Sequence, residues 1–118
     1  MLRIRTFVVV AGVAALALVA TAGAATPKLV GTVGPGFTIT LKQGGKTVKS
    51  LKAGTYSITV SDKANIHNFR LRGPGLNKEI TGVSFKGTKT VTVKLKKGKY
   101  TYVCDPHFTT MKGTFKVV

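Results

Sequence analysis

The chain has 118 residues, of which 19 are Lys or Arg and 3 are Asp or Glu, so its formal net charge is +16 at pH 7. This length suits one domain with one core, and no second domain, linker or repeat is visible in it. The basic excess fits a solvated surface or attraction to anionic partners, namely acidic redox proteins, cell-surface polymers or a membrane surface. Nucleic acid is not expected as a partner, because the sequence carries no recognition motif and opens with an export signal.

Residues 1–24 are expected to be a signal peptide. Arg3 and Arg5 form a basic start, an apolar run covers residues 7–19, and Ala22-Gly23-Ala24 supplies small residues for cleavage. The apolar run is short for a membrane span, but retention as an uncleaved anchor stays open. The mature domain is then residues 25–118, exported to the periplasm, the cell surface or the medium, and loss of two Arg lowers its charge from +16 to +14.

The rest of the chain alternates apolar and polar residues with a period of two, which is typical of half-buried strands. Strands are predicted at Phe37–Leu41, Tyr56–Val60, His67–Arg72, Val91–Leu95, Tyr100–Cys104 and Met111–Val117. Turns are predicted at Gly34-Pro35-Gly36, Gly44-Gly45, Ala53-Gly54, Gly73-Pro74-Gly75 and Lys97-Gly98. Six to eight short strands with this spacing predict an all-β fold, an antiparallel β-sandwich.

Four soft-metal ligands stand out after the first five residues: His67, Cys104, His107 and Met111 are the only His, Cys and Met there. A single Cys in an exported domain cannot form an internal disulfide, so its thiolate is available for chemistry. One thiolate, two imidazoles and a thioether form the ligand set of a mononuclear electron-transfer copper site, and they suit copper better than structural zinc.

Each of these residues also has a plainer interpretation. His67 alone fits a hydrogen-bonded strand histidine, Cys104 a small buried hydrophobe and Met111 core filler. His107 is harder to explain in this way, because the Cys-x-x-His spacing brings its ring and the Cys104 thiol onto one short loop. The four residues together indicate one bound copper ion.

The segment His67-Asn68-Phe69, followed by Cys104-Asp105-Pro106-His107 and Met111, resembles the blue copper proteins, or cupredoxins, of the plastocyanin, pseudoazurin and amicyanin type. The resemblance implies a Greek-key β-sandwich with His67, Cys104 and His107 as equatorial copper ligands and Met111 as the axial one. It also implies that Asn68 ties the two ligand loops together. Two departures are that three residues separate His107 from Met111, and that Asp105 stands where Ser or Thr is common.

The leading hypothesis is a monomeric, non-enzymatic carrier of single electrons between redox partner proteins that are themselves acidic. The alternatives are a copper-delivery protein without redox turnover and a metal-free sandwich that adheres to anionic surfaces. Two His cannot furnish the further copper sites of a multicopper oxidase or nitrite reductase, and no Ser-His-Asp or paired-carboxylate site is evident. Electrons are expected to leave through His107, within an apolar docking patch formed by Phe108, Pro74 and Gly75.

Overall fold

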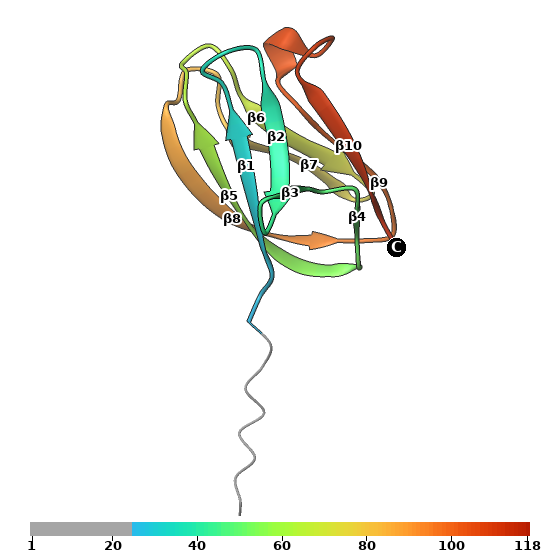
Figure 1. The fold of residues 1–118 in the computed structure, drawn as a ribbon. Helices are drawn as coiled ribbons and strands as arrows, with labels where there is room; N and C mark the ends of the chain where they lie inside the picture. Colours follow the sequence, from blue (N-terminus) through green and yellow to red (C-terminus); the bar gives the residue numbers. More distant parts are fainter. Residues whose placement is uncertain (1–24) are drawn as a thin grey trace, which may run out of the picture.

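The computed structural model describes residues 25–118, which form a β-sandwich of two five-stranded sheets (Figure 1). The predicted signal segment lies outside the described residues. The first sheet has the order β3-β2-β1-β5-β8 and the second the order β4-β10-β9-β6-β7. The elements are β1 (Lys28–Val33), β2 (Ile39–Gln43), β3 (Lys46–Thr47), β4 (Ser50–Leu51), β5 (Gly54–Asp62), β6 (Phe69–Gly73), β7 (Leu76–Thr81), β8 (Gly87–Leu95), β9 (Gly98–Val103), the 3-10 turn η1 (Asp105–His107) and β10 (Lys112–Val117).

Most neighbouring strands are antiparallel, as the sequence predicts, but two pairs are parallel. β1 runs parallel to β5, and β4 runs parallel to β10. The second pair arises because the chain leaves the first sheet after β3 and joins the second at β4. Between them Val48 is buried, and its backbone N–H bonds to the Leu41 carbonyl at 3.0 Å. Among residues 25–118, no helix is long and apolar enough to cross a membrane.

The predicted strands are present, with shifts at their ends. β2 begins at Ile39, so Phe37 belongs to the preceding loop, because the turn that starts at Gly34 extends further than its glycines suggest. β1, β3, β4 and β7 were not predicted. In β7 only the last two residues, Ile80 and Thr81, are buried, and this leaves no alternating pattern to recognise.

The core between the sheets is built on two stacked aromatic pairs. The Phe69 and Tyr102 rings are 5.9 Å apart and nearly parallel, and the Tyr100 and Phe115 rings are 5.4 Å apart. Such pairs stabilise a core by about 0.5–1.5 kcal/mol beyond the area they bury. Gly113 lies opposite Tyr102 in the β9–β10 pair, and a Cβ atom there would overlap the Tyr102 ring.

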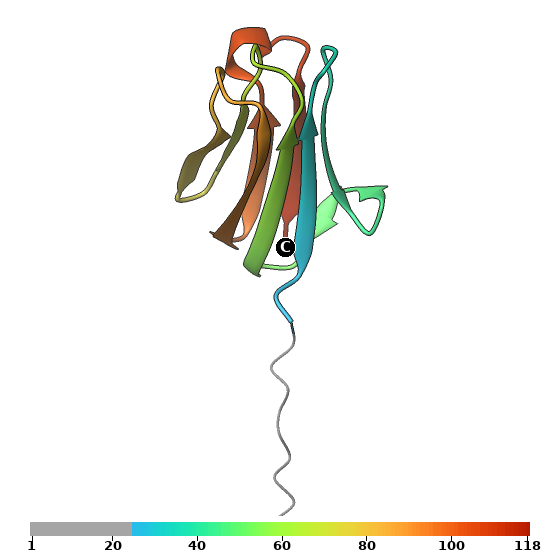
Figure 2. The same ribbon diagram turned by 90° about the vertical axis from the view of Figure 1, so that its left-hand side faces the viewer.

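The sandwich has two distinct ends, which Figures 1 and 2 show at top and bottom. The η1 end holds η1, the loop before β2 and the loop between β5 and β6. The C-terminal end holds the last residue, Val118, the β8–β9 turn and the entry of the chain into β1. Pro27, just before β1, accepts a hydrogen bond from the Ser57 backbone at 3.0 Å, which fixes that entry point beside β5.

Candidate metal centre

The ends of three strands bring the predicted ligands together at the η1 end. His67 precedes β6, Cys104 follows β9, His107 closes η1, and Met111 precedes β10. β6 and β9 are neighbours in the second sheet, with Arg70 opposite Val103, so the residues just outside their ends are neighbours too.

Backbone hydrogen bonds hold the loop from Cys104 to Met111 in one shape. The His107 N–H donates to the Cys104 carbonyl at 3.1 Å, and the Met111 N–H donates to the His107 carbonyl at 2.8 Å. The Cys104 N–H donates back to the Met111 carbonyl at 3.0 Å, so the loop is closed at its base. Pro106 has no N–H to satisfy, and it suits the first turn of η1.

The side chains of His67, Cys104 and His107 converge, and their ligand atoms lie within 4.8 Å of one another. Cys104 Sγ is 3.7 Å from Nδ1 of His67 and 3.5 Å from Nδ1 of His107, and the two Nδ1 atoms are 3.1 Å apart. One soft sulfur and two imidazole nitrogens facing a common point are donors that suit copper. The donor set therefore fits the metal that the sequence predicts.

The predicted ligands differ in how far they are buried. His67, Cys104 and Met111 have 0% of their surface exposed, whereas His107 is partly exposed. Met111 belongs to the same buried cluster as Cys104 and faces the core, as its strand alternation predicts. Its sulfur is thus kept from solvent on the buried side of the loop.

A polar network ties the two ligand-bearing segments together beside the site. The Asn68 side-chain amide donates to Asp105 Oδ2 at 2.7 Å and to Glu79 Oε2 at 3.0 Å, and its oxygen accepts the Asp105 N–H at 2.6 Å. Arg70 Nε donates to Asp105 Oδ2 at 2.9 Å, and its Nη2 to Glu79 Oε2 at 3.2 Å. Asn68 is therefore buried, although strand alternation predicts it on the outer face.

The network sets the charge of Asp105. Partial burial would raise the pKa of this carboxyl group, but the hydrogen bonds from Arg70 and Asn68 and the charges of Arg70 and Arg72 outweigh it and hold the pKa below its usual value. Asp105 is therefore a carboxylate at neutral pH, paired with the Arg70 guanidinium next to Cys104.

Phe37 and Gly34 were missed as site residues. The Phe37 ring lies edge-on to both imidazoles, 5.5 Å from the His67 ring and 4.9 Å from the His107 ring, and is 62% exposed. Gly34 has a positive φ of 72°, and a Cβ atom on it would lie 3.0 Å from His67 Cδ2. The Gly34-Pro35-Gly36 turn signal marks this loop, but nothing local in the sequence shows that it folds over His67.

The predicted docking patch is wrong in part. Phe108 is 61% exposed beside His107, as expected. Pro74 and Gly75 lie at the C-terminal end instead, because a Cβ atom on Gly98 would be 2.5 Å from Pro74 Cγ, and Gly75 faces Lys96. The turn they form joins the far ends of β6 and β7, about 20 Å of extended strand away from Cys104.

The comparisons with known proteins agree with this geometry. Residues 37–118 match the family described as copper binding proteins, plastocyanin/azurin family. The chain is 34% identical over 59 residues to amicyanin-alpha of Methylorubrum extorquens, a match that covers 48% of this chain and half of that protein.

The solved structures of copper proteins resemble this one in fold. A rusticyanin copper protein superposes with a TM-score of 0.59 at 24% identity, over 79% of this chain and 78% of that one. Auracyanin A, a blue copper protein from Chloroflexus aurantiacus, superposes with a TM-score of 0.53 at 18% identity, over 77% of this chain and 98% of that one. With the family match extending from Phe37 to the C-terminus, the chain belongs to the plastocyanin/azurin family of copper binding proteins.

Proposed function

We propose that this protein binds one copper ion and carries single electrons between redox partner proteins, as a blue type 1 copper protein. The observation that supports this best is the convergence of Cys104 Sγ with Nδ1 of His67 and of His107. In this proposal these three residues would hold the copper, and buried Met111 would supply a fourth, weak thioether ligand.

Copper in such a site supplies reversible one-electron chemistry between Cu(I) and Cu(II). The chain's own contribution is to keep its ligands still. His67 and Cys104 are attached to the ends of paired strands, and the loop that carries His107 is closed by three backbone hydrogen bonds. Because neither segment has to move when the charge changes, reorganisation is small.

Burial favours a carrier over the alternative of a copper-delivery protein. A delivery site has to present its metal to an incoming ligand, whereas His67, Cys104 and Met111 are completely buried. Of the four predicted ligands only His107 is partly exposed, which suits passage of an electron rather than of an ion. We propose His107 as the exit, with Phe37 and Phe108 as the apolar docking surface around it.

The finer points of partner and location are also proposals. The +16 net charge supports acidic redox partners, and the sequence of residues 1–24 supports export to the periplasm, cell surface or medium. Relatives in this family pass electrons to partner proteins, and a soft copper site with an exposed histidine edge fits that role here.

The test is a titration of the apo-protein with Cu(II), followed by visible absorption and voltammetry. One equivalent is expected to produce an intense charge-transfer band from the Cys104 thiolate, and Cys104→Ala is expected to abolish it. Reversible voltammetry, with copper retained against a competing chelator, then identifies a carrier.

Thr109→Ala is the matched control, because Thr109 is exposed on the same loop and is not a predicted ligand. A Cys104→Ala variant that kept the band would overturn the assignment. Rapid loss of copper to the chelator, with no reversible wave, would favour delivery instead.

A further inference from the structure

The charges of the molecule are divided between its two ends. All three acidic residues belong to the half that contains the η1 end, where Asp62 closes β5, Asp105 opens η1, and Glu79 bonds to Asn68. The other half has lysines and no acidic residue. Its ten lysines, all exposed, are Lys28, Lys42, Lys46, Lys49, Lys52, Lys94, Lys96, Lys97, Lys99 and Lys116. We call this surface the lysine end.

Two of these lysines are placed at a cost to stability. Lys99 and Lys116 lie directly opposite each other in the antiparallel β9–β10 pair. Lys97 immediately precedes β9. Like charges that face each other across a strand pair are destabilising. Among residues 25–118 no carboxylate bridges them, because the two ion pairs in this part of the chain both involve Arg70 at the other end. An anion bound between the two ammonium groups would remove that repulsion.

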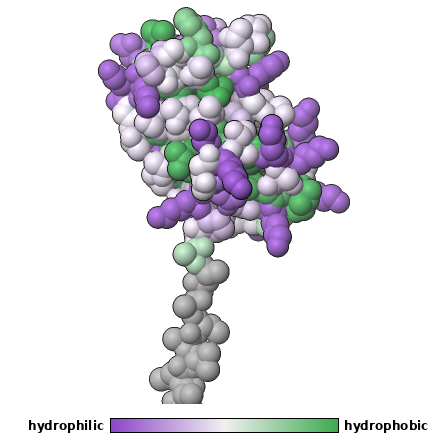
Figure 3. Space-filling model, viewed as in Figure 1, coloured by the Kyte–Doolittle hydropathy of each residue, from purple (hydrophilic) through white to green (hydrophobic). Residues whose placement is uncertain are grey.

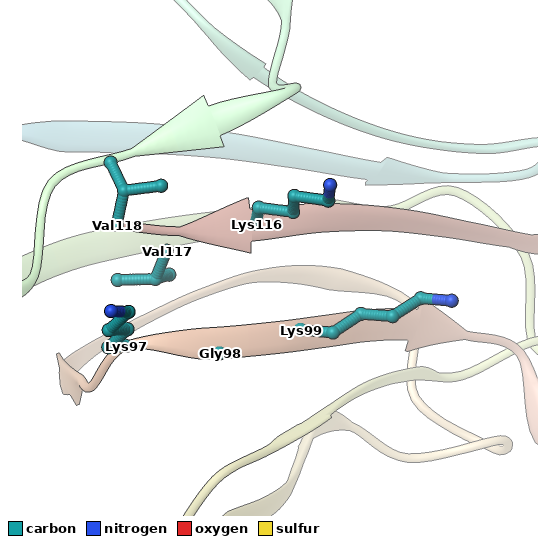
Figure 4. Close-up of a pocket in the computed structure, with 6 residues that line it drawn as sticks. All are labelled: Lys97, Gly98, Lys99, Lys116, Val117 and Val118. Atoms are coloured by element: carbon teal, nitrogen blue, oxygen red, sulfur yellow. The ribbon is translucent and has the colours of Figure 1, made fainter.

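The same strands form a shallow open pocket of about 290 Å³, with an apolar floor and a basic rim (Figure 4). Val118, which is 64% exposed, and the edge of buried Val117 line its floor. The Lys99 and Lys116 side chains extend alongside each other from neighbouring strands. In Figure 3 hydrophilic side chains surround an apolar spot at the lower right, where Figure 1 places the C-terminus. An apolar floor with an ammonium rim fits an amphipathic anion.

The chain enters the sandwich at this same end. Pro27 is held beside Ser57 at the start of β5, and the apolar run of residues 7–19 precedes it in the sequence. The lysines are spread over the ends of both sheets rather than along one groove. A broad anionic plane matches this arrangement better than a single shaped partner does.

We propose that the lysine end docks on an anionic phospholipid bilayer, with the η1 end facing away from the membrane. The lysine ammonium groups bind lipid phosphates, and the exposed Val118 side chain lies against the adjoining acyl region. The same orientation results whether residues 1–24 are cleaved or retained, because both the charge and the entry of the chain are at this end. The proposal does not depend on copper, so it can fail or succeed independently of the proposed function.

The test measures binding of the full chain to vesicles of phosphatidylcholine alone and of phosphatidylcholine with phosphatidylglycerol. Comparing the affinities for the neutral and the anionic vesicles removes any contribution of the apolar run of residues 7–19 that does not depend on lipid charge. We expect at least about tenfold tighter binding to the anionic vesicles, decreasing as salt rises.

Two variants with equal charge change locate the surface. The lysine-end variant carries Gln in place of Lys49, Lys97, Lys99 and Lys116, and the η1-end variant carries Gln in place of Lys63, Lys86, Lys89 and Lys112. All eight lysines are exposed, so both variants should fold, and circular dichroism is the check. The lysine-end variant should lose at least about tenfold in affinity for anionic vesicles, and the η1-end variant should lose much less.

Equal losses in the two variants would overturn the proposal, because they would show attraction by net charge alone. No preference for anionic vesicles would overturn it as well. If polyphosphate or an acidic protein bound the lysine end while vesicles did not, that end would recognise a soluble polyanion, and the membrane orientation would be wrong.

Discussion

The burial of Met111 is compatible both with core packing and with a role as a metal ligand. The residue is completely buried and packs in the same cluster as Cys104. Met111→Leu keeps the volume and the burial but removes the thioether, so the fold and copper binding should persist. Because an axial thioether donates weakly to Cu(II), its loss is expected to raise the reduction potential, as measured by voltammetry.

The matched control is Leu71→Met, which exchanges the same two side chains at a buried core position on β6. It should leave the potential unchanged. A Met111→Leu variant with an unaltered spectrum and potential would show that Met111 only fills the core.

Asp105 is a negative charge next to the Cys104 thiolate, and its effect is offset by Arg70. Asp105→Asn preserves the shape of the side chain but removes the ion pair at 2.9 Å and leaves the Arg70 guanidinium less neutralised. A positive charge disfavours the more oxidised metal, so the reduction potential should rise. Voltammetry at constant ionic strength measures this shift.

Glu79→Gln is the control, because Glu79 also pairs with Arg70 and bonds to Asn68 but is not adjacent to a predicted ligand. Its shift should be smaller than that of Asp105→Asn. Equal shifts would mean that only the net charge of the network matters and that the position of Asp105 beside Cys104 has no special effect.

Among the elements, the sequence predicts those in which apolar and polar residue types alternate along the strand. β5, β8, β9 and β10 alternate clearly and were predicted within a few residues of their ends. β7 was missed because it is mostly exposed, and β4 because two residues carry no period. The parallel pairing of β1 with β5 could not be predicted either, since alternation does not specify the direction of a neighbour.

The residues of the candidate site likewise divide into those that the sequence reveals and those that it does not. Its proposed ligands stand out in the sequence because their chemistry is rare in this chain, and Cys104 and His107 are close in sequence. Phe37 could not be predicted, because an aromatic residue beside a turn has no local sign that it contacts His67, thirty residues later. Alternation along the predicted strand places Arg70 on its outer face, but its role in neutralising Asp105 depends on the pairing of β6 with β9.

Gly113 shows how tightly β9 and β10 are packed. Gly113→Ala would place a methyl group in the space of the Tyr102 ring, which lies in the stack with Phe69. Overpacking of this kind typically costs about 1–3 kcal/mol, so the free energy of unfolding should fall by that amount in urea denaturation of the apo-protein. Thr114→Ala, at the exposed next position, should change it by less than about 0.5 kcal/mol.

A decrease no larger than that of Thr114→Ala would show that the Tyr102 ring can shift without loss. In that case the close approach of the two strands would not be what stabilises this part of the second sheet.

At the scale of the whole molecule, most of the lysines and the proposed exit for electrons, His107, lie at opposite ends. From Gly98 to Cys104 the chain runs along β9, a length of about 20 Å, whereas charges are screened beyond about 8 Å at physiological ionic strength. The lysine end therefore contributes little to the field at His107. Steering of an acidic partner falls to the lysines of the η1 end, around the apolar surface of Phe37 and Phe108.

This separation predicts that the two charge variants rank in opposite order in two assays. The lysine-end variant should lose more in vesicle binding, and the η1-end variant should lose more in the rate of oxidation. With hexacyanoferrate(III), a small anionic oxidant, the η1-end variant of the reduced copper protein should react about two- to threefold more slowly than the unaltered protein, and the lysine-end variant should react nearly as fast as it does. Stopped-flow oxidation rates across a salt series measure this, with a cationic cobalt complex as the control that should not be slowed. If the two variants slow equally with hexacyanoferrate(III), the field acts as a single net charge. The lysines would then draw anionic partners to the molecule without directing them to either end, and docking at His107 would depend on Phe37 and Phe108 alone.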